Sequence, residues 1–446
     1  MHHGIAGASW FDEVQEQVAY YGDDFWVIAR EGFGTFLEDF LVRLNGDRLK
    51  VPTLFQIVER SGKTAACLNY LVFKGDTPHE ARVPTLLSLL PGVSSREAVH
   101  GPSQLWLGDF VSGPRVQGRT LHHKGGLLHR FGMDDRSTGT LLCELAESGL
   151  PDLTVAYFAD NDYRSHEVGP HGALPVLEQV DAMLAEAFEA GGGFEVFLRE
   201  TCVIVTSDHG HCEVLADADR ALIRLDERLS DFRQATLGGL WREDDQLMIC
   251  PNMRATQLYL RQPTAEQVEW ITAAALADAR VDQVVWRTAL TRSGASGYTV
   301  ATARGRLEFW RGDRTSDSAR DAFDTAWTWR GDIEAADLQQ SGGRIAWTEY
   351  PNAFERLAGV LDLENSGEIW MTAQPGCEFQ VPGGSGHLGG ASHGALHRLD
   401  SDSIAIVAGG PLHFTLPSDL RVVDLFNLCL QVLGLPVTAR SGLTAR

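Results

Sequence analysis

Apolar and polar positions alternate along the chain in a pattern that is typical of an α/β domain. Short apolar runs are separated by amphipathic stretches, which predicts a largely parallel central sheet flanked by helices. We expect strands at residues 64–73, 153–158, 202–206 and 403–408. Helical periodicity predicts helices at residues 52–61, 174–190 and 420–433.

The pattern changes between residues 245 and 345. Short strands separated by turn residues are expected at 256–260, 281–285, 297–301 and 307–309, with an alanine-rich helix at 264–278. This run predicts a small α+β cap at 245–345, inserted into a core made of 1–244 and 346–446. The Asp-, Arg- and Ser-rich stretch 311–345 is expected to be a surface loop or part of that cap.

Composition and charge narrow the class of protein. With 44% hydrophobic and 22% charged residues, the chain has the composition of an ordinary globular protein. Its 60 acidic and 38 basic residues give a net charge of -22, which repels nucleic-acid backbones and anionic lipid. We therefore expect neither a nucleic-acid polymer nor a membrane as a partner. The seven scattered cysteines include no C-x-x-C pair, which predicts a reduced, cytoplasmic protein.

Candidate chemistry lies next to three of the expected strands. Asp162 and His166 follow the strand at 153–158, Asp208 and His209 follow the strand at 202–206, and His393 precedes the last strand. In open α/β sheets, ligands bind beyond the carboxyl ends of the strands. We expect each of these side chains on a tight, glycine-containing loop.

Histidine and carboxylate are the ligands that a zinc-like cation takes, and two such ions can clamp both oxygens of a phosphoryl transfer. Each motif alone has an ordinary alternative, since an aspartate that caps a turn explains Asp-His-Gly as well. Taken together, near the ends of expected strands, the three motifs predict a metal site.

The order of the motifs is D-x-x-x-H-x-x-G-P, then T-S-D-H-G, then G-x-S-H-G. It resembles the type I phosphodiesterase/nucleotide pyrophosphatase branch of the alkaline-phosphatase superfamily. His3-Gly-Ile also resembles the H-G-I that follows the nucleophile helix in that branch. The resemblance spans essentially the whole chain and is least specific in the cap.

The resemblance implies an alkaline-phosphatase-like α/β fold and a phosphodiesterase- or phosphatase-type hydrolase. The implied substrate is a small-molecule phosphate ester or nucleotide. Two divalent ions are implied, with zinc favoured and manganese or iron also fitting the ligands. Asp162, His166 and His393 would bind one ion, and Asp208 and His209 the other. His211 and His387 lie beside these motifs as candidate supporting donors.

The resemblance also implies a missing segment. In the family, a nucleophilic Thr or Ser and a further metal-binding Asp precede H-G-I, so both are expected upstream of Met1. This chain alone would then be inactive. Thr85, after Pro84, is a weaker nucleophile candidate, since a helix N-terminus explains it.

Two rivals remain: a degenerate binding protein that has lost its nucleophile, and a phosphomutase or phosphonate hydrolase of the same superfamily. The sequence leaves the oligomeric state open.

Overall fold

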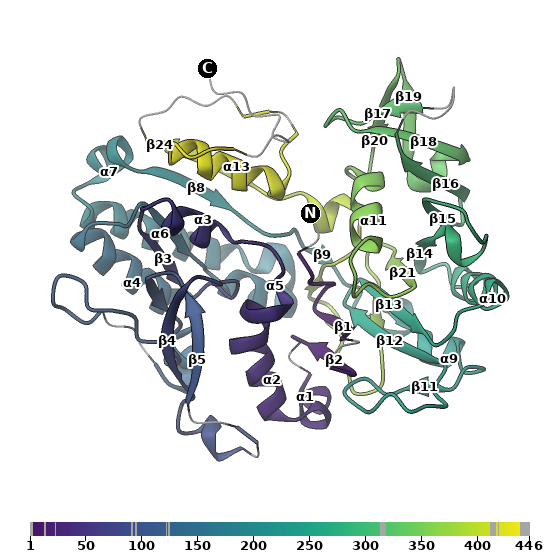
Figure 1. Ribbon diagram of the computed structural model, residues 1–446, viewed down its shortest axis with the longest axis horizontal. Coiled ribbons are helices and arrows are strands. Elements are labelled where there is room, and N and C mark those ends of the chain that lie inside the picture. The colour runs from purple at the N-terminus through teal and green to yellow at the C-terminus, as the bar shows by residue number, and fades with distance from the viewer. Residues whose placement is uncertain are drawn as a thin grey trace. The chain divides into compact units, whose positions relative to one another are not determined.

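The computed structural model describes residues 3–12, 15–22, 24–90, 92–93, 96–121, 123, 125–312, 318–410, 416–417 and 419–437 (Figure 1). Met1, upstream of which we expect the nucleophile, lies outside them. The chain divides into two compact units. The first unit comprises Met1–Gly32, Ser165–Pro170 and His209–Asp402, and the second comprises Phe33–Arg164, His171–Asp208 and Ser403–Arg446.

The second unit is an α/β unit. Its helices are α2 (Phe33–Glu38), the π-helical η1 (Asp39–Arg48), α3 (Leu54–Arg60), the 3-10 helices η2 (Leu87–Leu89) and η3 (Leu127–Gly132), α4 (Asp135–Ser148), α6 (Leu174–Ala190), α7 (Phe194–Glu200) and α13 (Val422–Val432). Its strands are β3 (Ala65–Leu68), β4 (Thr77–Arg82), β5 (Arg96–Gly101), β6 (Gln104–Trp106), β7 (Leu153–Ala156), β8 (Cys202–Thr206) and β24 (Ala405–Gly409). Helix α5 (Asp160–Gly172) belongs partly to each unit.

A three-stranded parallel sheet, in the order β6-β3-β7, forms the centre of the second unit. Successive residues of β3 face opposite sides, as the period of a strand requires. Ala65 and Cys67 pack with Phe55 and Val58 of α3 in one core. On the other side of the sheet, Ala66 and Leu68 pack in a core with residues of α4 and α6, which lie beside β3 in Figure 1. The strand is thus covered by helices on both faces.

The first unit is built on an eleven-stranded, mainly antiparallel sheet, in the order β11-β12-β13-β21-β14-β15-β16-β18-β17-β20-β19. These strands are β11 (Gln234–Ala235), β12 (Leu247–Asn252), β13 (Ala255–Leu260), β14 (Val281–Arg287), β15 (Tyr298–Thr302), β16 (Gly305–Arg311), β17 (Ser318–Arg320), β18 (Ala326–Gly331), β19 (Leu338–Ser341), β20 (Arg344–Trp347) and β21 (Ile369–Ala373). Three further strand pairs are β1 (Ser9–Asp12) with β2 (Gln17–Tyr20), β9 (Cys212–Glu213) with β23 (Ala391–Ser392), and β10 (Leu222–Arg224) with β22 (Glu378–Gln380).

Helices cover the strands of the first unit. They are α1 (Phe25–Glu31), α8 (Ala218–Ala221), α9 (Leu225–Arg228), α10 (Ala265–Leu276), η4 (Thr288–Leu290), η5 (Ile333–Ala336), α11 (Ala353–Leu361) and α12 (Arg398–Ser401). Helix α11 buries Phe354 and Leu357 against the sheet, in one core with Phe309 and Trp327. The ring of Phe354 stacks on that of Phe309, with 4.3 Å between centroids.

The expected α/β class is confirmed, and most expected elements lie within a few residues of their predicted places. Two details differ. The parallel sheet has three strands, since β8 pairs with β24 in a separate antiparallel pair. Of the two alternatives for the stretch 311–345, the surface loop is wrong. The described part of this stretch contains β17 to β20, and Ala319, Trp327, Trp329 and Ile345 are buried in the core of the antiparallel sheet. Residues 313–317 are outside the described part. No helix in the described ranges is long and apolar enough to cross a membrane.

Candidate metal centre

A short antiparallel strand pair brings two of the three histidine motifs together. In the pairing of β9 with β23, Cys212 lies opposite Ser392. Extending this register by one residue places His211 opposite His393, just beyond the paired strands. The centroids of the His211 and His393 rings lie 5.2 Å apart. Strand pairing therefore joins motifs that are far apart in the sequence.

The D-x-x-x-H motif lies on a helix, so the expectation of a loop is wrong here. Asp162 and His166 are one turn apart on α5, and both side chains project from one face. The helix kinks at Gly169, where φ is +76°, just before Pro170. The carbonyl oxygen of His166 comes so close to Gly390 that a Cβ atom there would lie only 1.9 Å from it. A glycine at 390 thus lets the third motif pack against α5.

Three histidines form a compact group in the first unit. His166, His211 and His393 each offer a ring nitrogen, and these nitrogens lie within 4.8 Å of one another. On the same helix as His166, Asp162 offers a carboxylate oxygen within that distance of the His166 nitrogen. Nitrogen and oxygen donors at such spacing fit a divalent cation such as zinc. His211 was expected only as a supporting donor, because the register that sets it opposite His393 is not visible in the sequence.

Hydrogen bonds orient two of the rings. A carbonyl oxygen can only accept, so Nδ1 of His166 donates to the carbonyl of Ala391, at 2.7 Å. The Nε2 atom then carries the lone pair that a metal ion takes. In the same way Nδ1 of His387 contacts the buried carboxylate of Glu378 at 2.8 Å, and the His387 ring lies 4.3 Å from that of His166. Such partners are typical of histidines at metal sites, where they fix the tautomer.

His209 lies beside this group. Its ring stacks on that of His393, with 3.6 Å between centroids and 15° between planes. Its Nδ1 donates to the carbonyl of Gly210 at 3.1 Å. The structure therefore brings His209 next to His393, but His211 rather than His209 belongs to the compact group of donors.

The two carboxylates of the second unit, Asp162 and Asp208, influence the same tyrosine. Burial, followed by the charges of Asp208 and Asp162, raises the pKa of Tyr157 above its ordinary value. Burial and Asp208 also raise the pKa of Tyr70, whose ring lies 5.7 Å from that of Tyr157. Asp208 immediately precedes His209 in the chain.

A cavity of about 380 Å³ opens beside His393 in the first unit. Its wall is mainly apolar and includes Trp370 and Leu363. The wall also includes Ala8, whose N–H group donates to Oδ1 of Asn252 at 2.6 Å. Apolar surface therefore adjoins the histidine group.

Comparison with known proteins gives a family for this chain. Residues 1–380 match the family model of type I phosphodiesterase/nucleotide pyrophosphatase. No curated protein matches the sequence significantly.

Solved structures with a TM-score above 0.5 support the fold. Murine ectonucleotide pyrophosphatase/phosphodiesterase 5 is 12% identical, with a TM-score of 0.52, and the match covers 99% of this chain and 82% of the murine one. An inactive form of the murine protein in complex with AMP is 14% identical, with a TM-score of 0.51, over 99% and 81% of the two chains. Phosphonoacetate hydrolase from Sinorhizobium meliloti 1021 gives a TM-score of 0.48 at 14% identity, over 97% of this chain and 80% of that one.

The family match covers most of the chain, including the D-x-x-x-H and T-S-D-H-G motifs. This chain belongs to the type I phosphodiesterase/nucleotide pyrophosphatase family of hydrolases, within the alkaline-phosphatase superfamily.

Proposed function

We propose that this chain carries the metal-binding core of a two-metal phosphoric ester hydrolase. Asp162, His166 and His393 bind one divalent ion, with His211 as a fourth candidate ligand. Asp208 and His209 bind the second. The observation that carries the proposal is the group of His166, His211 and His393, whose ring nitrogens lie within 4.8 Å of one another. The mixed His and Asp donors favour zinc, and manganese or iron also suits them.

The bound ions would polarise the phosphoryl group and lower the pKa of an attacking hydroxyl. The chain's own residues hold and orient the ligands: Ala391 accepts from His166, and Glu378 fixes His387 next to it. The substrate is a small phosphate ester or nucleotide. In this proposal the segment 245–345, expected as a cap on the core of 1–244 and 346–446, selects the leaving group.

We further propose that the nucleophilic Thr or Ser and a further metal-binding Asp come from a segment preceding Met1 in the natural polypeptide. Support comes from the second unit. Among the described strands, β7 pairs only with β3, and β8 only with β24. Each of these apolar strands therefore keeps one unpaired edge, which a further strand would complete. In this reading the segment adds a strand that ends next to the metal ligands.

The test compares this chain with a version extended upstream by the natural reading frame. Metal content and hydrolysis of bis(4-nitrophenyl) phosphate are measured for both. We expect only the extended protein to bind about two ions and to hydrolyse the ester. His393→Ala should abolish turnover and remove an ion, while His171→Ala, at an exposed histidine of α5, should change neither. If neither protein binds metal or hydrolyses the ester, the proposed function is wrong.

A further inference from the structure

A buried ion pair lies directly behind the histidine loops of the first unit. Arg254 lies in the turn between β12 and β13, and Asp400 lies on the one-turn helix α12. Both side chains are 0% exposed, and Nε of Arg254 lies 3.1 Å from Oδ2 of Asp400. We propose that this pair is the positioning unit that holds the His393 loop and the His209–His211 loop together. The inference rests on the metal site proposed above.

Each partner of the pair contacts the His393 loop. Oδ2 of Asp400 accepts from the N–H group of Ala395, at 3.0 Å. The backbone N–H of Arg254 donates to the carbonyl of His393, at 2.9 Å. Gly394, between these two anchors, has φ of +107°. The chain thus turns sharply just after His393, and its two sides are held by the two residues of the ion pair, one through the backbone of Arg254 and the other through the carboxylate of Asp400.

Asp400 also contacts the other loop, through its backbone. Its carbonyl accepts from the N–H group of Gly210 at 2.9 Å, directly after His209. The approach is close, because a Cβ atom at 210 would lie 2.6 Å from the carbonyl oxygen of Leu399 and 2.8 Å from that of Asp402. One residue therefore fixes the spacing of both loops.

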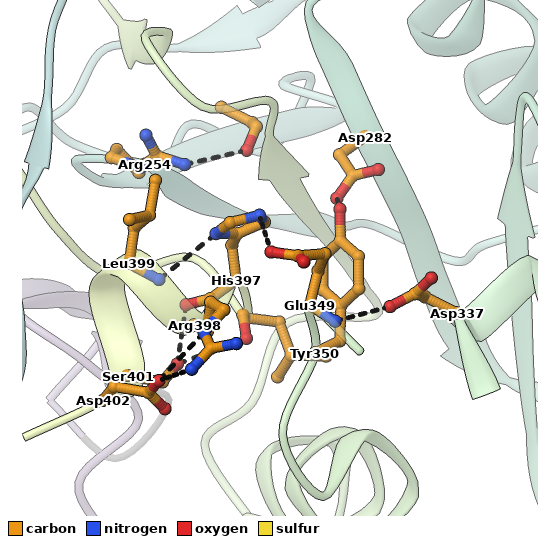
Figure 2. A network of polar contacts seen from close by, with 12 residues as sticks. Arg254, Asp282, Asp337, Glu349, Tyr350, His397, Arg398, Leu399, Ser401 and Asp402 are labelled. Carbon is orange, nitrogen blue, oxygen red and sulfur yellow. Dashed lines mark hydrogen bonds and ion pairs between the residues drawn. The ribbon is translucent and has the colours of Figure 1, made fainter. Parts of the chain in front are cut away.

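Helix α12 is itself anchored by polar contacts, which Figure 2 shows. Nδ1 of His397 accepts from the N–H group of Leu399 at 3.2 Å, and its Nε2 lies 3.3 Å from the carboxylate of Glu349. The N–H group of Glu349 in turn donates to Asp337 at 2.7 Å. These contacts hold α12 in place, so the position of Asp400 is defined independently of the loops that it contacts.

Stability alone explains the pair poorly. A buried ion pair loses hydration, and an apolar pair of similar size is often as stable or more stable. Here the pair is also incompletely satisfied, since Nη1 of Arg254 and Oδ1 of Asp400 have no hydrogen-bond partner among the described residues. Partners behind the metal ligands that orient them do affect metal binding, typically by about 10- to 100-fold.

The experiment measures zinc affinity of the full chain by competition with a chelating dye, at a temperature where every variant is folded. Asp400→Ala should weaken zinc binding by about 10- to 100-fold. The double variant Arg254→Met with Asp400→Leu removes both buried charges, so its Tm should exceed that of Asp400→Ala. Its zinc affinity should stay low, because Ala395 still lacks its acceptor. Full recovery of zinc affinity in the double variant would overturn the proposal.

Asp321→Asn is the matched control. Asp321 is equally buried in the first unit, and its carboxylate accepts from Phe323, Thr325 and Trp327, away from the histidines. It should lower Tm without changing zinc affinity.

Hydrogen exchange without metal separates this inference from the proposed function. Asp400→Ala should speed exchange at Ala395 and the residues around His393, whereas Asp321→Asn should not. If neither the unmodified chain nor the upstream-extended protein binds zinc, the proposed metal site fails, whatever the exchange rates are. Equal exchange in the two variants would overturn the positioning role itself.

Discussion

Strands β13 and β21 of the first unit and strands β7 and β8 of the second unit have similarly apolar sequences but differ in burial. In the first unit every residue of β13 and β21 is buried. In the second unit no residue of β7 or β8 is fully buried, although their sequences, LTVA and CVIVT, are as apolar. Helix α6 continues this contrast, since Leu174 is 51% and Leu177 47% exposed. Parallel strands such as β7 are normally covered on both faces. Strands β7 and β8 of the second unit are therefore less completely covered than β13 and β21 of the first.

Replacing a buried apolar side chain of the first unit should cost more stability than replacing an exposed one of the second unit. Leu258, in β13, is 0% exposed, and Ile406, in β24, is 54% exposed. Leu258→Ala should cost about 2–5 kcal/mol of unfolding free energy, through lost burial and a residual cavity. Ile406→Ala should cost less than about 1 kcal/mol, because little apolar area is lost. Urea denaturation of both variants checks this. A similar cost for the two variants would mean that β24 is covered in solution.

Two glycines with positive φ differ in how closely the surrounding atoms pack against them. Gly394, in the first unit, has φ of +107°, and a Cβ atom there would lie 2.6 Å from the carbonyl oxygen of Asn252. Gly149, in the second unit, has φ of +94° and nothing within 4 Å. Gly394→Ala should cost about 3 kcal/mol and weaken zinc binding, since strain and a backbone clash add. Gly149→Ala should cost only about 1 kcal/mol. Thermal unfolding of the pair gives the difference, and equal costs would show that the His393 turn can relax.

Much of the fold could be predicted because local patterns decide it. The apolar run of β8 and the helical period of α6 are visible in the sequence, and α6 spans Leu174–Ala190 as expected. The eleven-stranded sheet could not be predicted in full, because it depends on pairings between distant strands. For example, β21 pairs with both β13 and β14.

Some residues of the candidate site could be predicted from local motifs, and others are placed by long-range contacts that the sequence does not reveal. His166 and His393 could be chosen from their motifs, because the residue types and the glycines around them are local signals. The place of His211 depends on the register Cys212 to Ser392, and that of Asp400 on a side chain that reaches back to Ala395. Neither contact has a signature in the spacing of residues.

A buried carboxylate of the second unit makes stability depend on pH. In the second unit, burial raises the pKa of Asp135 to about 6, although Arg130 opposes this. The unfolded chain loses this proton near pH 4. Stability should therefore fall as pH rises from about 4 to about 6, with a full cost of about 2 kcal/mol above that window. Asp135→Asn can still accept from the N–H group of Asp160, as Asp135 does at 2.9 Å, and should remove this loss. Urea unfolding at pH 4 and pH 7 measures it, and an unchanged pH slope in the variant would contradict the assignment.

The smallest expected change in stability comes from Asp278 in the first unit, whose pKa is lowered rather than raised. Hydrogen bonds from Arg280 lower the pKa of Asp278 to about 2, although burial opposes them, and Arg228 also contacts this carboxylate at 2.7 Å. Because the folded pKa lies below the unfolded one, the contribution is present above about pH 4 and is lost as pH falls toward 2. Asp278→Asn should cost about 1 kcal/mol at pH 7, since both guanidinium groups are partly exposed. The cost should vanish near pH 2, as acid titration of the unfolding midpoint can test.

Asp135→Asn and Asp278→Asn should therefore change stability in opposite directions at pH 7. If both destabilise the protein, burial does not govern Asp135, and the second unit is better solvated around it than the structure indicates.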